Sequence, residues 1–166
     1  MIIRNARKEE LPLIRKQRLE AYDEHEKSVN EKHWQALKQT VQTDVDMQPG
    51  VELLVAEIDG QLVGSVVLFP QKVDAYEGKV EELDYPEIRL LAVPTESRGK
   101  GVATALIKEC FTRAKEKGNS HIGLHTGSFM GKAIRLYEGL GFERLPKFDF
   151  EPINDGIIVR AYRKAL

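Results

Sequence analysis

The sequence predicts a mixed α/β fold of the α+β type, in which about four helices flank a central sheet of about seven strands. Three observations predict it. Two β-branched and apolar runs at residues 51–58 and 62–69 are separated only by Asp59-Gly60, a dipeptide typical of a two-residue antiparallel hairpin. A strand–helix–strand pattern follows at residues 87–126, and such a unit favours parallel pairing. The length of 166 residues suits a single domain spanning residues 1–166.

The first half of the chain places two helices before the hairpin. Apolar residues near helical spacing predict an amphipathic helix over residues 8–24. Trp34 and Val41 lie two turns apart on one face of a second helix, predicted over residues 30–44, and Asn30 can cap its start. The other elements of this half are a short strand at residues 1–4, the two hairpin strands and a polar loop at residues 71–86.

The second half contains a glycine-rich turn between a strand and a helix. The strand at residues 87–93 is stopped by Pro94, which lacks the amide that a central strand needs. The helix begins near residue 99 or 100, continues to residue 117 and is ended by Gly118. The remaining patterns predict a strand at residues 121–126, a helix at 130–140 and strands at 142–150 and 156–163.

Composition and charge exclude several classes of protein. Hydrophobic residues make up 42% and charged residues 31%, which is typical of a globular protein. The net charge of −1 is too balanced for a general nucleic-acid binder. The longest charge-free apolar stretch, residues 61–71, is far shorter than the roughly 20 residues that a membrane span needs. The N-terminus lacks an apolar signal core, so we expect a cytoplasmic protein with neither nucleic acid nor membrane as partner.

The single cysteine and the scattered histidines predict no metal site. Cys110 excludes an internal disulfide and any multi-cysteine zinc site. Its helical spacing from Leu106 favours a buried core residue over a nucleophile. His25 and His33 lie among charged helix residues, where we expect them to be solvated.

The turn Arg98-Gly99-Lys100-Gly101-Val102-Ala103 suits a pyrophosphate. Glycines allow the backbone to approach a ligand closely, and the amides of a first helical turn point at it with the positive end of the helix dipole. A Rossmann fingerprint is poorly matched, because Thr104 stands where a third glycine or an alanine is needed. A P-loop is excluded, since the chain lacks the Gly-Lys-Ser/Thr run that follows its first glycine.

Two segments in this order resemble the signatures of the GNAT family of acyl-CoA-dependent N-acyltransferases. Leu91-Ala92-Val93 followed by Arg98-Gly99-Lys100-Gly101-Val102-Ala103 matches the acyl-CoA signature, and residues 133–142 match the later A-x-x-L-Y-x-x-x-G-F run. The resemblance covers nearly the whole chain. It implies a sheet that splays between its fourth and fifth strands, where the pantetheine arm of acetyl-CoA would enter.

The resemblance also implies the residues of a cosubstrate site and of the chemistry. Main-chain groups of Leu91 and Val93 would hydrogen-bond the pantetheine, and the amides from Gly99 to Thr104 would cradle the pyrophosphate. The expected acetyl-CoA site comprises Leu91, Ala92, Val93, Arg98, Gly99, Lys100, Gly101, Val102, Ala103 and Thr104.

In such enzymes a neutral amine attacks the thioester directly, so a base and an acid are needed and a metal is not. Tyr137 stands at the position of the family's common general acid; a phenol, with an ordinary pKa near 10, keeps its proton until a thiolate of pKa near 8.5 leaves. Glu87 and His125 are rival candidates for the base, and a water chain is a third. A purely structural role stays open for each of the three residues.

The resemblance implies an acceptor that is a primary amine of a small molecule or peptide. Residues 74–87 carry a net charge of −5, and if they face the cleft they favour a cationic acceptor such as a polyamine. Trp34, Tyr22 and Phe69 are candidates for lining the acceptor pocket, although each also suits the core. The alternative function is a non-catalytic acyl-CoA sensor. Many members of the family pair as homodimers through C-terminal strands, which residues 157–162 would permit.

Overall fold

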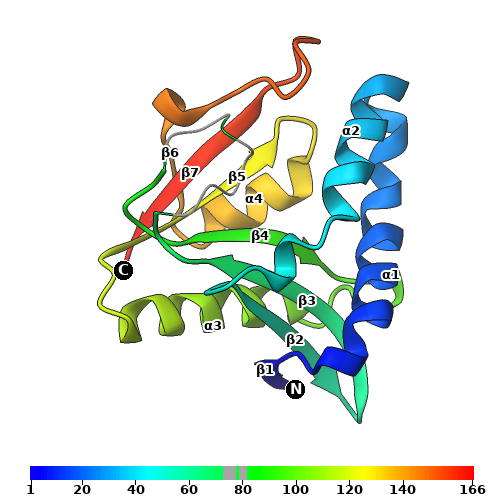
Figure 1. Cartoon of the computed structure of the whole chain (residues 1–166), viewed down its shortest axis with the longest axis vertical. Coiled ribbons are helices and arrows are strands. Elements are labelled where there is room, and N and C mark those ends of the chain that lie inside the picture. The colour runs from blue at the N-terminus through cyan, green and yellow to red at the C-terminus, as the bar shows by residue number, and fades with distance from the viewer. Residues whose placement is uncertain (73–77, 79–81) are drawn as a thin grey trace.

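The computed structural model describes residues 1–72, 78 and 82–166. Within them a mixed sheet has the strand order β1-β2-β3-β4-β5-β7-β6 (Figure 1). All neighbouring strands are antiparallel except β4 and β5, which are parallel. The strands are β1 Ile2–Asn5, β2 Glu52–Ile58, β3 Gln61–Phe69, β4 Glu87–Ala92, β5 His121–Gly127, β6 Glu143–Arg144 and β7 Val159–Ala165. The prediction of a seven-stranded mixed sheet is thereby confirmed.

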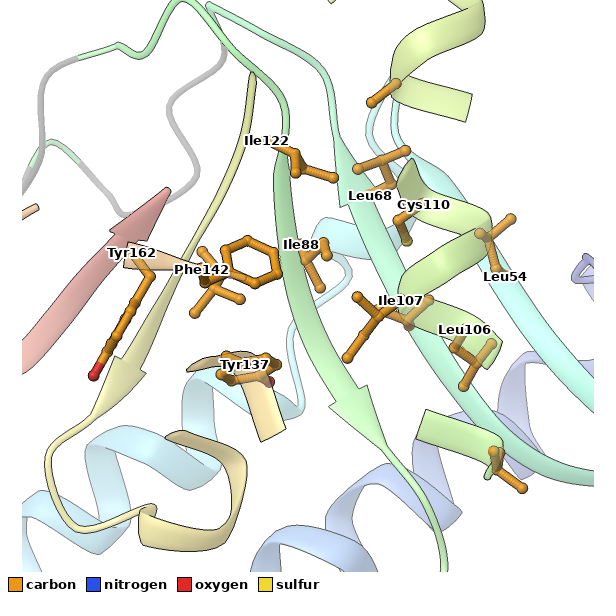
Figure 2. Packing of buried hydrophobic residues seen from close by; sticks show 14 of the residues in the cluster. Leu54, Leu68, Ile88, Leu106, Ile107, Cys110, Ile122, Tyr137, Phe142 and Tyr162 are labelled. Atoms are coloured by element: carbon orange, nitrogen blue, oxygen red, sulfur yellow. The ribbon is translucent and has the colours of Figure 1, made fainter. Parts of the chain in front are cut away.

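Four α-helices cover the two faces of the sheet in the described chain, as predicted. They are α1 Leu11–Tyr22, α2 Glu31–Val41, α3 Val102–Glu116 and α4 Gly131–Gly139. In Figure 1, α1 and α2 stand side by side at the right and α3 crosses the lower left. Alternate residues of β2 serve different cores, since Leu53 packs in the cluster with α1 and α2, whereas Leu54 packs in the cluster with α3 and α4. Figure 2 shows the second of these cores around Ile88 and Ile107.

Short-range signals in the sequence account for the element boundaries. Asp59 and Gly60 both have positive φ angles, 50° and 80°, as the predicted two-residue hairpin requires. The Asn30 side chain accepts a hydrogen bond from the backbone amide of His33 and so caps α2 as predicted. Gly118, with a φ of 83°, follows the end of α3 in the left-handed conformation that stops a helix.

The segment after α4 differs from the strand predicted over residues 142–150. Only β6 pairs with β7 there, and Phe150 makes an isolated bridge to Val159. Between them Pro146–Phe148 forms a 3₁₀ turn, because Pro146 has no amide hydrogen to donate to a ladder. The prediction of a long sixth strand was therefore wrong. The same turn places the Phe148 carbonyl within hydrogen-bonding distance of His125 on β5.

The sheet opens between β4 and β5. These strands pair only at Glu87 with Gly123 and at Ile88 with Leu124, and beyond them β5 pairs with β7 alone. On the other side of β4 the register with β3 shifts, and Leu90 there has a φ of 53°, a left-handed conformation that costs a leucine of order 1–3 kcal/mol. The bulge ends the parallel pairing and produces the splay that the resemblance implied.

In the part of the chain that the structure describes, no helix has the length and apolar character to cross a membrane.

Candidate active site

An open cavity of about 540 Å³ lies where β4 ends and α3 begins. We call it the first cavity. Its walls are the end of α1 with the 3₁₀ turn Asp23–Ser28, the end of β4, the turn into α3 and the start of α4. It is lined by residues 21–22, 24–25, 28, 91–93, 97–99, 101–104, 129–133 and 137. Nine of the ten residues predicted for the acetyl-CoA site lie in this lining; Lys100 does not, and it is exposed.

The turn into α3 presents bare backbone to the first cavity. Gly99 and Gly101 have φ angles of 78° and 77°, and a Cβ atom added to either would meet no other atom within 4 Å. Gly101 is the N-cap of α3, so the free amides of the first turn follow it directly. The first residue of α3 packs directly on Gly64 of β3. A Cβ atom at Gly64 would lie 2.7 Å from Cγ1 of Val102, so a larger residue there would push the start of α3 away from the sheet. The arrangement can bind an anion through backbone amides and the helix dipole.

The Arg98 side chain links two walls of the first cavity, the end of β4 and the turn after α1. Its Nε donates to the Val93 carbonyl at 3.1 Å, and its Nη1 pairs with Oε2 of Glu24 at 2.7 Å. Burial of the Glu24 carboxyl acts to raise its pKa, but the hydrogen bond and the charge of Arg98 act against burial, and the pKa lies below its ordinary value. Lys132 at the start of α4 contributes a second cation to the lining, a residue that the sequence motifs did not indicate.

A second cavity of about 280 Å³ lies on the α1 and α2 side of the opening. It is lined by residues 22, 33, 36, 37, 40, 41, 43, 45, 48, 88–91, 125–127, 129, 130, 137, 150, 152 and 159. Most of these residues come from α2, the turn after it, β4, β5 and the segment between β6 and β7. Tyr22 lines it, whereas Trp34 and Phe69, at 3% and 1% exposure, belong to the core.

His33 is buried in this wall and not solvated as we predicted from its charged neighbours. Its Nδ1 lies 2.8 Å from Oδ2 of Asp155, and Nδ2 of Asn30 donates to the same oxygen at 2.8 Å. Asp155 belongs to the segment between β6 and β7 and lies 122 residues away in the chain. The contact therefore fastens this segment to the start of α2.

Tyr137 lies at the junction of the two cavities. It lines both of them, together with Tyr22, Leu91, Phe129 and Met130. Figure 2 shows its ring in the core below β4. Burial raises the pKa of Tyr137, and the hydroxyl of Tyr22 and the thiol of Cys110 act in the same direction. The phenol therefore holds its proton throughout the neutral range.

Glu87 and His125, the two rival candidates for the base, form one hydrogen-bonded pair. Oε2 of Glu87 lies 2.9 Å from Nδ1 of His125, and both side chains are almost wholly buried. The other ring nitrogen, Nε2, lies 3.0 Å from the Phe148 carbonyl, which can only accept, so Nε2 carries hydrogen. One further proton then sits between Nδ1 and Oε2. His125 lines the second cavity and Glu87 does not, so the carboxylate reaches the cavity only through the imidazole.

Cys110 takes the structural role that its spacing predicted. It is a fully buried residue of α3 and lies between Leu68 and Ile107 in Figure 2. Burial raises the pKa of its thiol to about 12, which leaves it unreactive at neutral pH. Among the described residues, no three His, Cys, Asp or Glu side chains are grouped closely enough to hold a metal ion.

Residues 13–142 of the chain match the model of the acetyltransferase (GNAT) family. Among curated proteins, a probable N-acetyltransferase family 8 member 5 of Mus musculus is 36% identical over 94 residues, which are 57% of this chain and 39% of that protein. The uncharacterized N-acetyltransferase YjgM of Escherichia coli is 34% identical over 98 residues, 59% of this chain and 54% of that protein. The matches thus span well under two thirds of either relative.

A solved structure shares the fold over nearly its whole length. The PaiA N-acetyltransferase of Thermoplasma acidophilum, in complex with coenzyme A, superposes with a TM-score of 0.73 and 17% sequence identity. The superposition covers 99% of this chain and 98% of that one.

Proposed function

Because the chain belongs to the GNAT family of acetyltransferases, we propose that it transfers the acetyl group of acetyl-CoA directly to a primary amine. The observation that carries this proposal is the meeting of two cavities at Tyr137 and the bulged end of β4. The larger cavity ends in an anion-binding helix terminus that suits a pyrophosphate, and the smaller one suits the acceptor. Coenzyme A is also bound by the Thermoplasma protein that shares this fold.

We place acetyl-CoA in the first cavity with its pyrophosphate at Gly99, Gly101 and the first amides of α3. The pantetheine then runs along the end of β4, where the missing β5 partner leaves main-chain groups available. The Val93 carbonyl already accepts from Arg98, so the Val93 amide and the Leu91 main chain are the groups proposed to bind the pantetheine.

In the proposed step, the amine nitrogen forms a bond to the thioester carbon and the carbon–sulfur bond breaks. One proton leaves the nitrogen and one joins the sulfur. Tyr137 donates the proton to the departing thiolate, for which a protonated phenol at the junction is suited. The oxygen that gains charge accepts a hydrogen bond from a main-chain amide at the β4 bulge.

The Glu87–His125 pair is the proposed acceptor of the amine proton. The proton between Nδ1 and Oε2 must first leave to solvent water, and the deprotonated pair then takes up the proton that the amine nitrogen loses. Both ring nitrogens already have protein partners, so the proton travels through a water molecule or through exchange of the Phe148 contact. Glu87 and His125 thus act together and are not alternatives.

Calorimetric titration with acetyl-CoA, followed by a panel of primary amines with detection of free thiol, tests the proposal. Binding with amine-dependent thiol release supports a transferase. Binding with no release from any amine favours the alternative of an acyl-CoA sensor, and absence of binding contradicts the assignment of the first cavity.

A further inference from the structure

The second cavity has a wall that continues the hydrophobic core with α1 and α2. Val41 and Leu90 are buried members of that core cluster, and Leu37 and Val45 pack against it. The same four residues line the second cavity. Phe150 lines it as well, from the segment between β6 and β7. A ligand in this cavity therefore meets aliphatic and aromatic carbon from α2, the turn after it, β4 and the segment before β7.

Three hydroxyl groups in the lining of the second cavity already donate within the protein. Oγ1 of Thr40 donates to the Ala36 carbonyl at 3.1 Å, and Oγ1 of Thr43 donates to the Thr40 carbonyl at 2.9 Å. Oγ1 of Thr126 donates to the sulfur of Met130 at 3.4 Å. A polar acceptor that needed these hydrogens would have to break contacts that an apolar acceptor leaves intact.

The junction of the two cavities determines where an acceptor can lie. Its amine must reach Tyr137 and the Glu87–His125 pair, which the proposed reaction uses. The rest of the acceptor then lies against the lining that the second cavity does not share with the first, which includes Leu37, Val41 and Phe150. The volume of about 280 Å³ is near the lower end of the roughly 300–1,000 Å³ typical of ligand pockets, and it suits a small molecule.

From this lining we propose that the acceptor is a small primary amine with an apolar body, an alkylamine or an arylalkylamine. The proposal rests on the proposed function and names the substrate class of that same site. The body packs between α2 and the segment that carries Phe150, which the contact of His33 with Asp155 holds side by side. Affinity then comes from the removal of apolar carbon from water, so it grows with the apolar area of the acceptor.

The first test compares amines of equal charge and increasing length. Ethylamine, n-butylamine and n-hexylamine are assayed as acceptors with acetyl-CoA, and kcat/KM is measured from thiol release. Each buried CH₂ group is expected to raise kcat/KM about fourfold. We therefore expect n-hexylamine to exceed ethylamine about a hundredfold or more. A kcat/KM that does not rise with chain length would overturn the inference.

The second test adds a charge at constant length. In 1,5-diaminopentane an ammonium group replaces the terminal methyl group of n-hexylamine. That ammonium would be brought out of water against the carbon of Leu37 and Val41, which is costly for a charged group. We expect the diamine to have a kcat/KM about tenfold or more below that of n-hexylamine. A diamine that equals or exceeds n-hexylamine would overturn the inference.

A substitution that fills the second cavity shows whether the preference arises there. Ala36 of α2 lines the cavity, and Ala36→Leu adds apolar volume without charge. The ratio of kcat/KM for n-hexylamine to that for ethylamine should fall about tenfold or more, because the longer chain loses its space. Gln35→Leu is the matched control, since Gln35 is the exposed neighbour of Ala36 on α2 and lines neither cavity. An unchanged ratio in Ala36→Leu contradicts the inference, and the two wild-type comparisons decide if that variant does not fold.

Direct binding separates this inference from the proposed function. Ethylamine and n-hexylamine are titrated calorimetrically into the protein with and without coenzyme A. Tighter binding of n-hexylamine that Ala36→Leu weakens, without thiol release from acetyl-CoA, supports the apolar site and contradicts the transferase. Thiol release without a preference for the longer amine supports the transferase and overturns the inference. Absence of both results overturns both proposals.

Discussion

The first and second cavities share five lining residues, yet they are built from different parts of the chain. The centre of the first cavity is one continuous stretch, the end of β4 and the turn into α3, and it offers backbone amides. The second cavity is assembled from side chains of α2, β4, β5 and the segment before β7. Its wall depends on contacts such as that of His33 with Asp155, 122 residues apart.

This difference determines which of the two proposed sites a single side-chain substitution can reshape. A site made of backbone amides depends on φ angles and on glycines such as Gly99 and Gly101, so a short motif specifies it. A site made of side chains changes with each substitution in its wall. The proposed acetyl-CoA site therefore depends on the backbone of one turn, and the proposed acceptor site depends on side chains such as Leu37 and Phe150. Four substitutions test the division, starting with Tyr137, one of the five residues that line both cavities.

Tyr137→Phe should have the largest effect. Loss of a general acid is expected to lower kcat about 10²–10⁴-fold with little change in acetyl-CoA affinity. Because burial raises the pKa of Tyr137, the wild-type kcat should show no basic limb from this group below about pH 10. Steady-state kinetics over pH with a fixed acceptor measures both.

The matched control for this variant is Tyr162→Phe. Tyr162 lies in the same core and donates from its hydroxyl to Glu138 at 3.3 Å, but it lines neither cavity. Loss of a buried hydroxyl alone should therefore leave kcat unchanged. Near-normal turnover of Tyr137→Phe would remove the acid from the proposal.

Gly101→Glu should disable the first cavity alone. A carboxylate placed against the pyrophosphate adds a like charge, and the affinity for acetyl-CoA should fall about a hundredfold or more, since such contacts cost several kcal/mol. Gly118→Glu is the matched control, because Gly118 has a similar φ of 83° and similar open space at the other end of α3. Calorimetry measures both affinities. Equal affinities in the two variants would mean that the turn does not bind phosphate.

Glu87→Gln should act on the second cavity through His125. The amide keeps a hydrogen-bonding partner for Nδ1 but cannot share the proton, so kcat should fall about tenfold or more. The acidic limb of the pH profile of kcat/KM should change, whereas acetyl-CoA affinity should not. His125→Gln provides the second measurement. If both variants keep the wild-type acidic limb, the pair does not accept the amine proton.

The sequence predicts features that neighbouring residues determine, and it does not predict features that depend on contacts between distant segments. The hairpin at Asp59-Gly60 and the turn at Gly101 were predicted, because neighbouring residues determine them. The left-handed Leu90 was not, since nothing in a leucine favours that conformation and the strain is stabilised by strands on both sides. The burial of His33 was not predicted either, because its partner lies in a distant segment. Half of the predicted loop at residues 71–86, including Asp74, Glu77 and Glu81, lies outside the described residues.

Asp155→Asn should have the smallest effect and should reach the second cavity only. Burial acts to raise the pKa of Asp155, but hydrogen bonds from Asn30, the Ile157 amide and His33 outweigh it and hold the pKa below its ordinary value. A carboxyl whose pKa is lowered by folding stabilises the folded protein at every pH above its pKa in the unfolded chain, which is about 4. That stabilisation is lost only as the pH falls below this value. The contact with His33 therefore persists through the neutral range.

Loss of that charge should loosen the segment that carries Phe150 and Pro152, both of which line the second cavity. We expect the KM of the acceptor to rise a few-fold while the affinity for acetyl-CoA stays the same. Glu151→Gln is the matched control, because Glu151 lies in the same segment but its hydrogen bond stays within that segment. Its Oε2 accepts from the Gly156 amide at 3.2 Å. A rise in acceptor KM that is equal in both variants would assign the effect to charge in general. A loss of acetyl-CoA affinity in Asp155→Asn would show that the two cavities are coupled beyond the five residues they share.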